Sequence, residues 1–205
     1  DKTAARNFSR AARDVRHTIY LGGHMPEKGN APSEHLASRA ATGEILRKNL
    51  PATEFRAGAI IGSGSASFEI VRYLTERLPV MVTPKWVLNL AQPIGVRDVM
   101  KYLVAAAGKE PMGIVEIGAE RLRFLDMMKG YAKVRGLQRL IIPVPVLTPR
   151  LAALWIGLVT PVPNTIAVPI VEGLVHSVVA DTQRARELFP EIEPMGYEEA
   201  VELAL

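Results

Sequence analysis

The fold of this chain is decided by the stretch His35-Leu36-Ala37-Ser38-Arg39, which runs on into Ala40-Ala41-Thr42-Gly43-Glu44-Ile45-Leu46-Arg47. The stretch predicts a helix over 35–48. Residues four apart stack one turn above another on a helix, so His35 and Arg39 are expected on one face. An imidazole that titrates near neutrality would then lie one turn from a permanent cation.

The rest of the chain alternates between helical and extended patterns. The apolar spacing predicts helices over 4–15, 35–48, 66–78, 97–107 and 123–135, and strands over 17–22, 53–60, 91–95, 113–118 and 139–142. Beyond these, we expect helices at 148–159 and 164–173, a strand at 175–179, and helices at 181–188 and 197–204. Such alternation is typical of a mostly parallel sheet covered by helices.

Three further stretches carry a resemblance to a known family. Thr18-Ile19-Tyr20-Leu21-Gly22-Gly23 precedes the His35 helix, Thr53 to Gly62 follows it as a second strand, and Gln92 to Val99 adds a short strand and a helix opened by an acid. In order and spacing, residues 1–145 resemble the atypical and extended short-chain dehydrogenase/reductase superfamily, both its NmrA-like NAD(P)-binding members and its NAD-dependent epimerase/dehydratase-like members.

The resemblance implies an α/β, Rossmann-like fold with a smaller, mainly helical substrate-side subdomain. Residues 1–110 would form the back portion of the NAD(P)-binding domain, and 111–205 the substrate-side cap with a returning strand and C-terminal helices. A complete member opens with a Gly-x-x-Gly-x-x-Gly turn that holds the pyrophosphate, and the sequence has no such turn. We therefore expect a domain truncated at its N-terminus, with NAD or NADP bound only by a protein that carries the missing portion.

The resemblance also assigns roles to single residues. His35 takes the position of the catalytic tyrosine and Arg39 that of the ribose-binding lysine, while Gly22 and Gly23 stand where a serine or threonine is usual. Ala59, Ile60 and Ile61 would form the floor under the nicotinamide, so these three join Arg39, Gly22 and Gly23 as the cofactor-binding set. A surface histidine beside a solvated arginine explains the same pair equally well.

The loop Gly62-Ser63-Gly64-Ser65-Ala66-Ser67 links a strand to a helix, where free N–H groups gather and attract anions. We assign Ser63 and Ser65 to substrate binding, with helix capping as the alternative. Trp155 is placed on the substrate side of the cap, or else fills core space. His17, His24 and His176 lack metal-ligand spacing, so no metal site is predicted.

Composition narrows the classes of partner. The 25 basic and 21 acidic residues leave a net charge of +4 without a lysine-rich block, so no nucleic-acid partner is expected. Cysteine is absent, which is compatible with the cytoplasm and excludes thiol chemistry. Residues 151–171 carry no charge, but three prolines interrupt them. We expect two short helices packed over the sheet or against a second subunit, and no transmembrane span.

Three function classes remain open. The first is an NAD(P)-binding oxidoreductase or epimerase-like enzyme with its tyrosine and serine replaced, acting on a small or apolar carbonyl compound. The second is a non-catalytic dinucleotide-binding sensor or assembly factor of the NmrA-like kind. The third is a structural domain that only inherits the fold. A homo-oligomer is compatible with all three.

Overall fold

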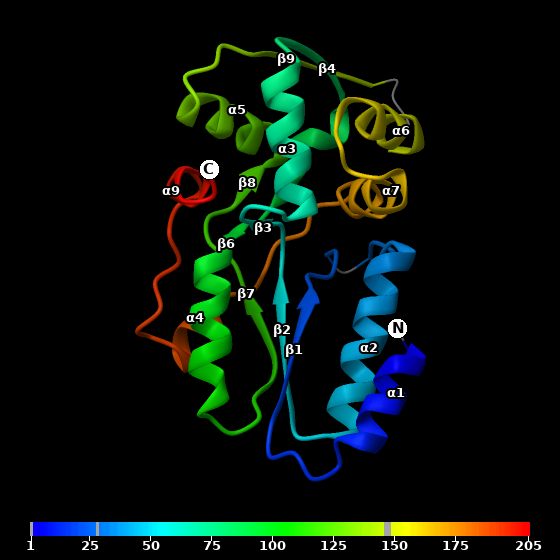
Figure 1. Cartoon of the computed structure of the whole chain (residues 1–205), viewed down its shortest axis with the longest axis vertical. Coiled ribbons are helices and arrows are strands. Elements are labelled where there is room, and N and C mark those ends of the chain that lie inside the picture. The colour runs from blue at the N-terminus through cyan, green and yellow to red at the C-terminus, as the bar shows by residue number, and fades with distance from the viewer. Residues whose placement is uncertain (1, 28, 146–148) are drawn as a thin grey trace.

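The computed structural model describes residues 2–27, 29–145 and 149–205. Its main sheet has three parallel strands, β1 (Thr18–Gly23), β2 (Ala52–Ala57) and β7 (Gly113–Ile117), in the order β1-β2-β7. Thr18 pairs with Ala52, and Thr53 pairs with Gly113. The expected parallel sheet with helical cover is confirmed (Figure 1).

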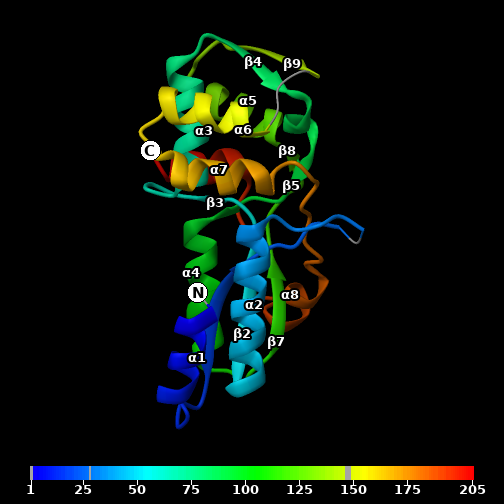
Figure 2. The ribbon, with the colours of Figure 1, turned by 90° about the vertical axis from the view of Figure 1, so that its right-hand side faces the viewer.

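Helices cover both faces of this sheet (Figures 1 and 2). They are α1 (Lys2–Ala11), α2 (Glu34–Asn49), α4 (Val96–Ala107) and α8 (Gln183–Leu188). Side chains alternate along β2, so Glu54 meets α2 while Phe55 packs against Tyr102 of α4 and against Phe189, which follows α8. Burial on both faces is typical of parallel strands.

A mainly helical lobe lies beyond the carboxyl ends of β1 and β2 (Figure 1). Its helices are α3 (Ala66–Arg77), α5 (Phe124–Val134), α6 (Pro149–Val159), α7 (Asn164–Gly173) and α9 (Tyr197–Glu202). Short strands join it: β3 (Ile60–Ile61) with β6 (Ile94–Gly95), β4 (Val80–Pro84) with β9 (Leu140–Val144), and β5 (Leu90–Ala91) with β8 (Leu122–Arg123), while η1 (Lys85–Leu88) is a 3-10 turn. Its core contains the fully buried Phe68, Met127 and Tyr131.

Several elements differ from those expected. The helix expected over 4–15 ends at Ala11, the strand expected over 91–95 is the two strands β5 and β6, and β4 was not expected. The strand expected over 53–60 is two strands, because β2 ends at Ala57 and β3 pairs with β6 instead of with the main sheet. The strand expected at 175–179 is a single bridge between Val178 and Ala91. β7, which lies after the expected division at residue 110, pairs with β2, which lies before it.

The uncharged segment forms the two expected short helices, α6 and α7; the expected start at residue 148 lies outside the described residues. Ala167 and Val171 of α7 are buried, as expected. The outer face of α6 is exposed in the single chain, where Leu158 is 77% exposed, because the described residues pack against the other face. Packing of this face against a second subunit stays a prediction. Within the described parts of the chain, no helix is long and apolar enough to cross a bilayer.

Candidate functional site

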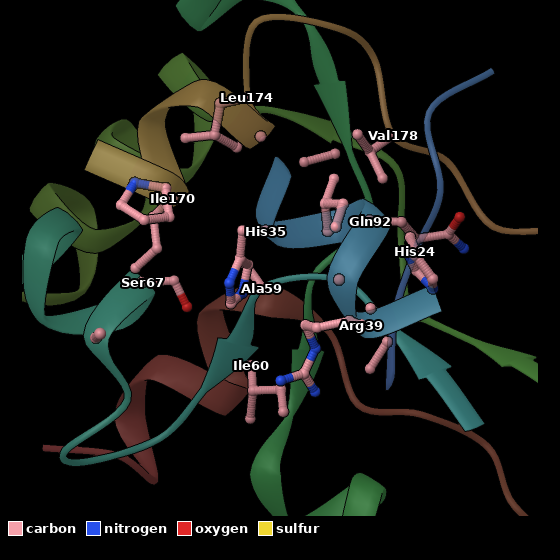
Figure 3. Close-up of a pocket in the computed structure, with 18 of the residues that line it drawn as sticks. His24, His35, Arg39, Ala59, Ile60, Ser67, Gln92, Ile170, Leu174 and Val178 are labelled. Carbon is pink, nitrogen blue, oxygen red and sulfur yellow. The ribbon is translucent and has the colours of Figure 1, made fainter. Parts of the chain in front are cut away.

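A pocket of about 340 Å³ opens at the carboxyl ends of β1 and β2, between the sheet and the helical lobe (Figure 3). This is the edge of a parallel sheet at which ligands usually bind. Its walls come from the end of β1, the first turns of α2 and α3, the loop after β2 and the last turns of α7, and include Leu21, Gly22, Gly23, His24, His35, Arg39, Gly58, Ala59, Ile60, Ser65, Ser67, Gln92, Phe124, Pro169, Ile170, Leu174 and Val178.

His35 reaches this pocket because α2 begins directly before it. Ser33 caps the helix, and its Oγ accepts a hydrogen bond of 3.4 Å from the backbone N–H of Leu36. The pKa of His35 is lowered, first by partial burial and then by the positive charge of Arg39. The imidazole is therefore neutral at neutral pH and presents one donor and one acceptor.

Arg39 lines the same pocket one turn further along α2. Its Nη2 donates a hydrogen bond of 2.6 Å to the carbonyl oxygen of Leu21, and the hydroxyl of Tyr20 donates to the carbonyl oxygen of Arg39 at 3.3 Å. Arg39 thus ties α2 to the end of β1. A guanidinium has five N–H donors, so others remain to meet a ligand.

The floor of the pocket is made of small residues. Gly22, Gly23 and Ala59 all line it, and Ile60 adds an apolar edge. A Cβ on Gly23 would lie 3.2 Å from Cδ2 of Leu36, closer than ordinary contact. Because Gly23 has no side chain, α2 packs closely against the end of β1. At this position the pocket meets backbone groups and no side-chain hydroxyl.

Three of the residues that the sequence proposed lie elsewhere. Ile61 is 1% exposed and packs in the core of the helical lobe. Ser63 is exposed and does not line the pocket. Trp155 lines a different cavity, between α6 and β4. Ser65 does reach the pocket, and its hydroxyl lies 3.1 Å from that of Ser67.

His24, which the sequence did not mark as a site residue, is 2% exposed and lines the pocket directly after β1. Its Nε2 lies 3.0 Å from the carbonyl oxygen of Ile117, which can only accept, so Nε2 carries the proton. Among the described residues Nδ1 has no partner. Burial lowers the pKa of His24. The negative charge of Glu116 and nearby backbone carbonyl groups act in the opposite direction, but their effect is smaller. The only sequence signal was its position at the strand end.

The side chain of Gln92 lines the pocket with its hydrogen-bonding groups already paired. Gln92 donates to the carbonyl oxygen of Ala119 at 2.8 Å and accepts from the N–H of Ala180 at 3.0 Å, so both ends of its amide are used. No carboxylate and no tyrosine is among the described residues that line the pocket. The described part of the chain also holds no cluster of histidine and acidic side chains able to bind a metal ion.

Comparison with solved structures identifies this arrangement. A structure of the NAD-dependent NDP-hexosamine 5,6-dehydratase TunA, involved in tunicamycin biosynthesis, covers 99% of the chain at 14% identity, with a TM-score of 0.67. The UDP-glucuronic acid 4-epimerase of Bacillus cereus covers 98% at 12% identity, also at 0.67. The chain has the NAD-dependent epimerase/dehydratase fold. No protein-family model and no curated protein sequence matches it.

A third epimerase/dehydratase neighbour, the UDP-glucose 4-epimerase of Thermotoga maritima, covers 98% of the chain at 14% identity, with a TM-score of 0.68. The chain spans 67% of the dehydratase and 65% and 66% of the two epimerases. The resemblance to the short-chain dehydrogenase/reductase superfamily is thereby confirmed at the level of the fold.

The Bacillus cereus epimerase is solved in complex with NAD, and the lining of this pocket has groups of the kind that one end of such a dinucleotide would need. Small and apolar groups at Gly58, Ala59 and Ile60 make a surface against which an aromatic ring can lie, and Arg39 offers donors for hydroxyl groups. The pyrophosphate normally binds a glycine-rich turn at a helix N-terminus. The sequence contains no Gly-x-x-Gly-x-x-Gly turn, so the residues that line the pocket could meet a ring and hydroxyl groups but offer no such turn for a pyrophosphate.

Proposed function

We propose that this chain forms the back portion of the NAD(P)-binding domain and the substrate-side cap of an NAD(P)-dependent oxidoreductase or epimerase-like enzyme in which His35 replaces the catalytic tyrosine. One observation carries the proposal: His35 and Arg39, one turn apart on α2, line a single pocket together with the glycine-rich end of β1. In this pocket His35, which can transfer a proton, lies beside the permanent positive charge of Arg39. Both are at the edge of the sheet where ligands usually bind.

We further propose that the substrate is a small, uncharged and largely apolar carbonyl compound. Ile170, Leu174 and Val178 lie across the pocket from Ile60 (Figure 3), and Phe124 adds a further apolar side chain to the lining. A sugar nucleotide would bring a diphosphate and many hydroxyl groups into this space. Burying those groups without polar partners is costly, and the described lining offers no set of cations for a diphosphate.

His35 would exchange a proton with the substrate oxygen, since its neutral imidazole has both a donor and an acceptor. Arg39 would hold a ribose hydroxyl and disfavour the imidazolium, but a guanidinium does not pass protons on. When bound, the nicotinamide supplies hydride transfer. His24 lies in the same wall, with its Nδ1 buried and without a partner among the described residues.

The decisive experiment measures binding before turnover. Calorimetry should show that this chain binds NAD⁺ or NADP⁺ only feebly, because the pyrophosphate turn is missing from the sequence. Ligand-observed NMR should detect short-chain ketones or aldehydes in the presence of the dinucleotide, with the signal lost in His35→Phe. Equal competition by a UDP-sugar would contradict the assigned substrate class, and tight dinucleotide binding would contradict the proposed mode of cofactor binding.

A non-catalytic dinucleotide sensor is the second candidate. It is favoured by the bond from Arg39 to the carbonyl oxygen of Leu21, which gives this cation a structural task, and by the absence of a tyrosine among the described lining residues. In a sensor, occupancy of the pocket changes a partner surface without chemistry. Ligand binding that persists in His35→Phe, with no turnover by either protein, would favour this reading.

A further inference from the structure

Helix α6 exposes its apolar residues. Leu151, Leu154, Trp155 and Leu158 are spaced as i, i+3, i+4 and i+7, which places them on one face of the helix. They are 56%, 49%, 52% and 77% exposed, while Ile156 on the other face is 6% exposed. A surface helix normally turns polar residues outward. The outer face of α6 is therefore apolar, as is typical of a helix face that is buried against another surface.

The neighbouring strands β4 and β9 continue this surface. Val80 pairs in register with Leu140, and Val82 pairs with Ile142. All four side chains are more than 40% exposed, because alternate residues of a strand point to the same side. We call the four residues of α6 and these four strand residues the apolar face: Val80, Val82, Leu140, Ile142, Leu151, Leu154, Trp155 and Leu158.

A groove of about 410 Å³ joins the two parts of the apolar face. It runs between β4 and α6, and its lining includes Val80 and Val82 from the strand and Leu151 and Trp155 from the helix. Figure 2 shows β4, β9 and α6 together at the end of the molecule away from the main sheet. Contiguous apolar surface of this kind marks an interaction site.

The charges around the apolar face are of one sign. The sequence has no acidic residue over 77–97 or over 127–171, while both stretches contain basic residues. Arg77 and Lys85 are exposed, and Arg77 donates to the carbonyl oxygen of Val159 at the end of α6. Arg139, directly before β9, donates to the backbone carbonyl oxygens of Thr75 and Glu76.

The acidic group closest in sequence to Arg77 is already neutralised. The carboxylate of Glu76 lies 3.8 Å from Arg72 and 3.5 Å from Arg135, and it accepts the hydroxyl of Tyr131 at 2.5 Å. Within the described residues, neither Arg77, Lys85 nor Arg139 forms an ion pair. The α6–α7 hairpin carries one acid, Glu172, near the end of α7. The border of the apolar face is thus positively charged.

We propose that the apolar face docks on the surface of an anionic phospholipid bilayer. Leucine and valine side chains would enter the boundary between headgroups and acyl chains, where a tryptophan ring is also favoured. Arg77, Lys85 and Arg139 would meet anionic headgroups. A second copy is the poorer occupant, because a two-fold interface would set the same basic border against itself.

Flotation of the chain with lipid vesicles tests this docking. The chain should float with phosphatidylcholine vesicles that contain phosphatidylglycerol, and much less with phosphatidylcholine alone. The double variant Leu154→Ser/Leu158→Ser should lower the partition coefficient roughly tenfold or more by removing inserted apolar area. Lys85→Gln should lower it roughly fivefold on anionic vesicles, and added salt should weaken binding of the unchanged chain.

The matched control is Val104→Ser. Val104 is 69% exposed on α4, beside the main sheet, and lies outside the apolar face. It should leave flotation unchanged. Vesicles with brominated acyl chains should quench the tryptophan fluorescence of the chain, and Trp155→Phe should abolish most of that quenching.

Two outcomes would overturn the docking proposal. One is equal flotation of the control and the double variant. The other is no flotation on anionic vesicles together with a concentration-dependent dimer, seen by analytical ultracentrifugation, that Leu154→Ser/Leu158→Ser dissociates. That second result would assign the apolar face to another copy of the chain. Neither outcome depends on cofactor or substrate binding in the pocket.

Discussion

The guanidinium of Arg39 is bonded to the carbonyl oxygen of Leu21, with 2.6 Å between Nη2 and the oxygen. The bond joins the second turn of α2 to the end of β1, and so it fixes the distance between the helix that carries His35 and the floor of the pocket. Arg39 therefore has a structural task in addition to any contact with a ligand. Substitutions at Arg39 should separate its contribution to stability from its contribution to ligand binding.

Arg39→Ala should lower the free energy of unfolding by about 1 kcal/mol, because it removes a partly buried hydrogen bond from a charged donor. Arg39→Lys should recover part of this loss with a single ammonium donor. Urea unfolding gives the stability, and calorimetry with NADP⁺ gives the affinity. Unchanged stability in Arg39→Ala would show that the bond to Leu21 contributes nothing.

His35→Phe should lower kcat roughly a hundredfold for any carbonyl substrate of the complete enzyme. It should also remove a limb from the pH profile. That limb lies below the usual histidine value of 6.5, because burial and Arg39 lower the pKa of His35. His176→Phe, which alters a histidine outside the pocket lining, is the control. A profile that His35→Phe leaves unchanged would exclude His35 as the acid or base.

The buried His24 should make stability fall as the solution is acidified. Its pKa is lower in the folded chain than in the unfolded chain, so below the usual value of 6.5 the unfolded chain binds more protons. The free energy of unfolding should drop between about pH 7 and about pH 5.5. His24→Gln should flatten this slope, whereas His176→Gln should not. An equal slope in both variants would argue against the buried neutral imidazole.

Gly43→Ala should destabilise the chain even though alanine favours a helix. A Cβ at Gly43 would lie against the carboxylate of Glu54, which Arg47 and Arg56 hold at 2.7 and 2.8 Å. Displacing this buried ion-paired group should cost about 1–3 kcal/mol. Gly173→Ala is the control, since its added Cβ meets only Leu36, at 3.8 Å. Equal stability in the two variants would show that Glu54 moves freely.

Periodicity and turn residues were enough to predict most of the helices and the parallel sheet. Helical spacing placed α2 within one residue at each end, because its cap at Ser33 and its residues up to Asn49 are local signals. The same local reasoning could not separate β2 from β3. Directly after the break, Gly58 lies against the backbone of Gln92, and β3 pairs with β6, both contacts between residues far apart in the chain.

The sequence by itself determined the spacing of His35 and Arg39 on one helix and the small residues at the end of β1, since helix and strand geometry are local. Only the tertiary structure decided that Ile61 and Trp155 lie away from the pocket while the buried His24 lines it. It also decided that α6 turns leucines outward. Burial depends on which elements pack together, and α6 has no charged residue from Leu151 to Val159 that would mark its outer face.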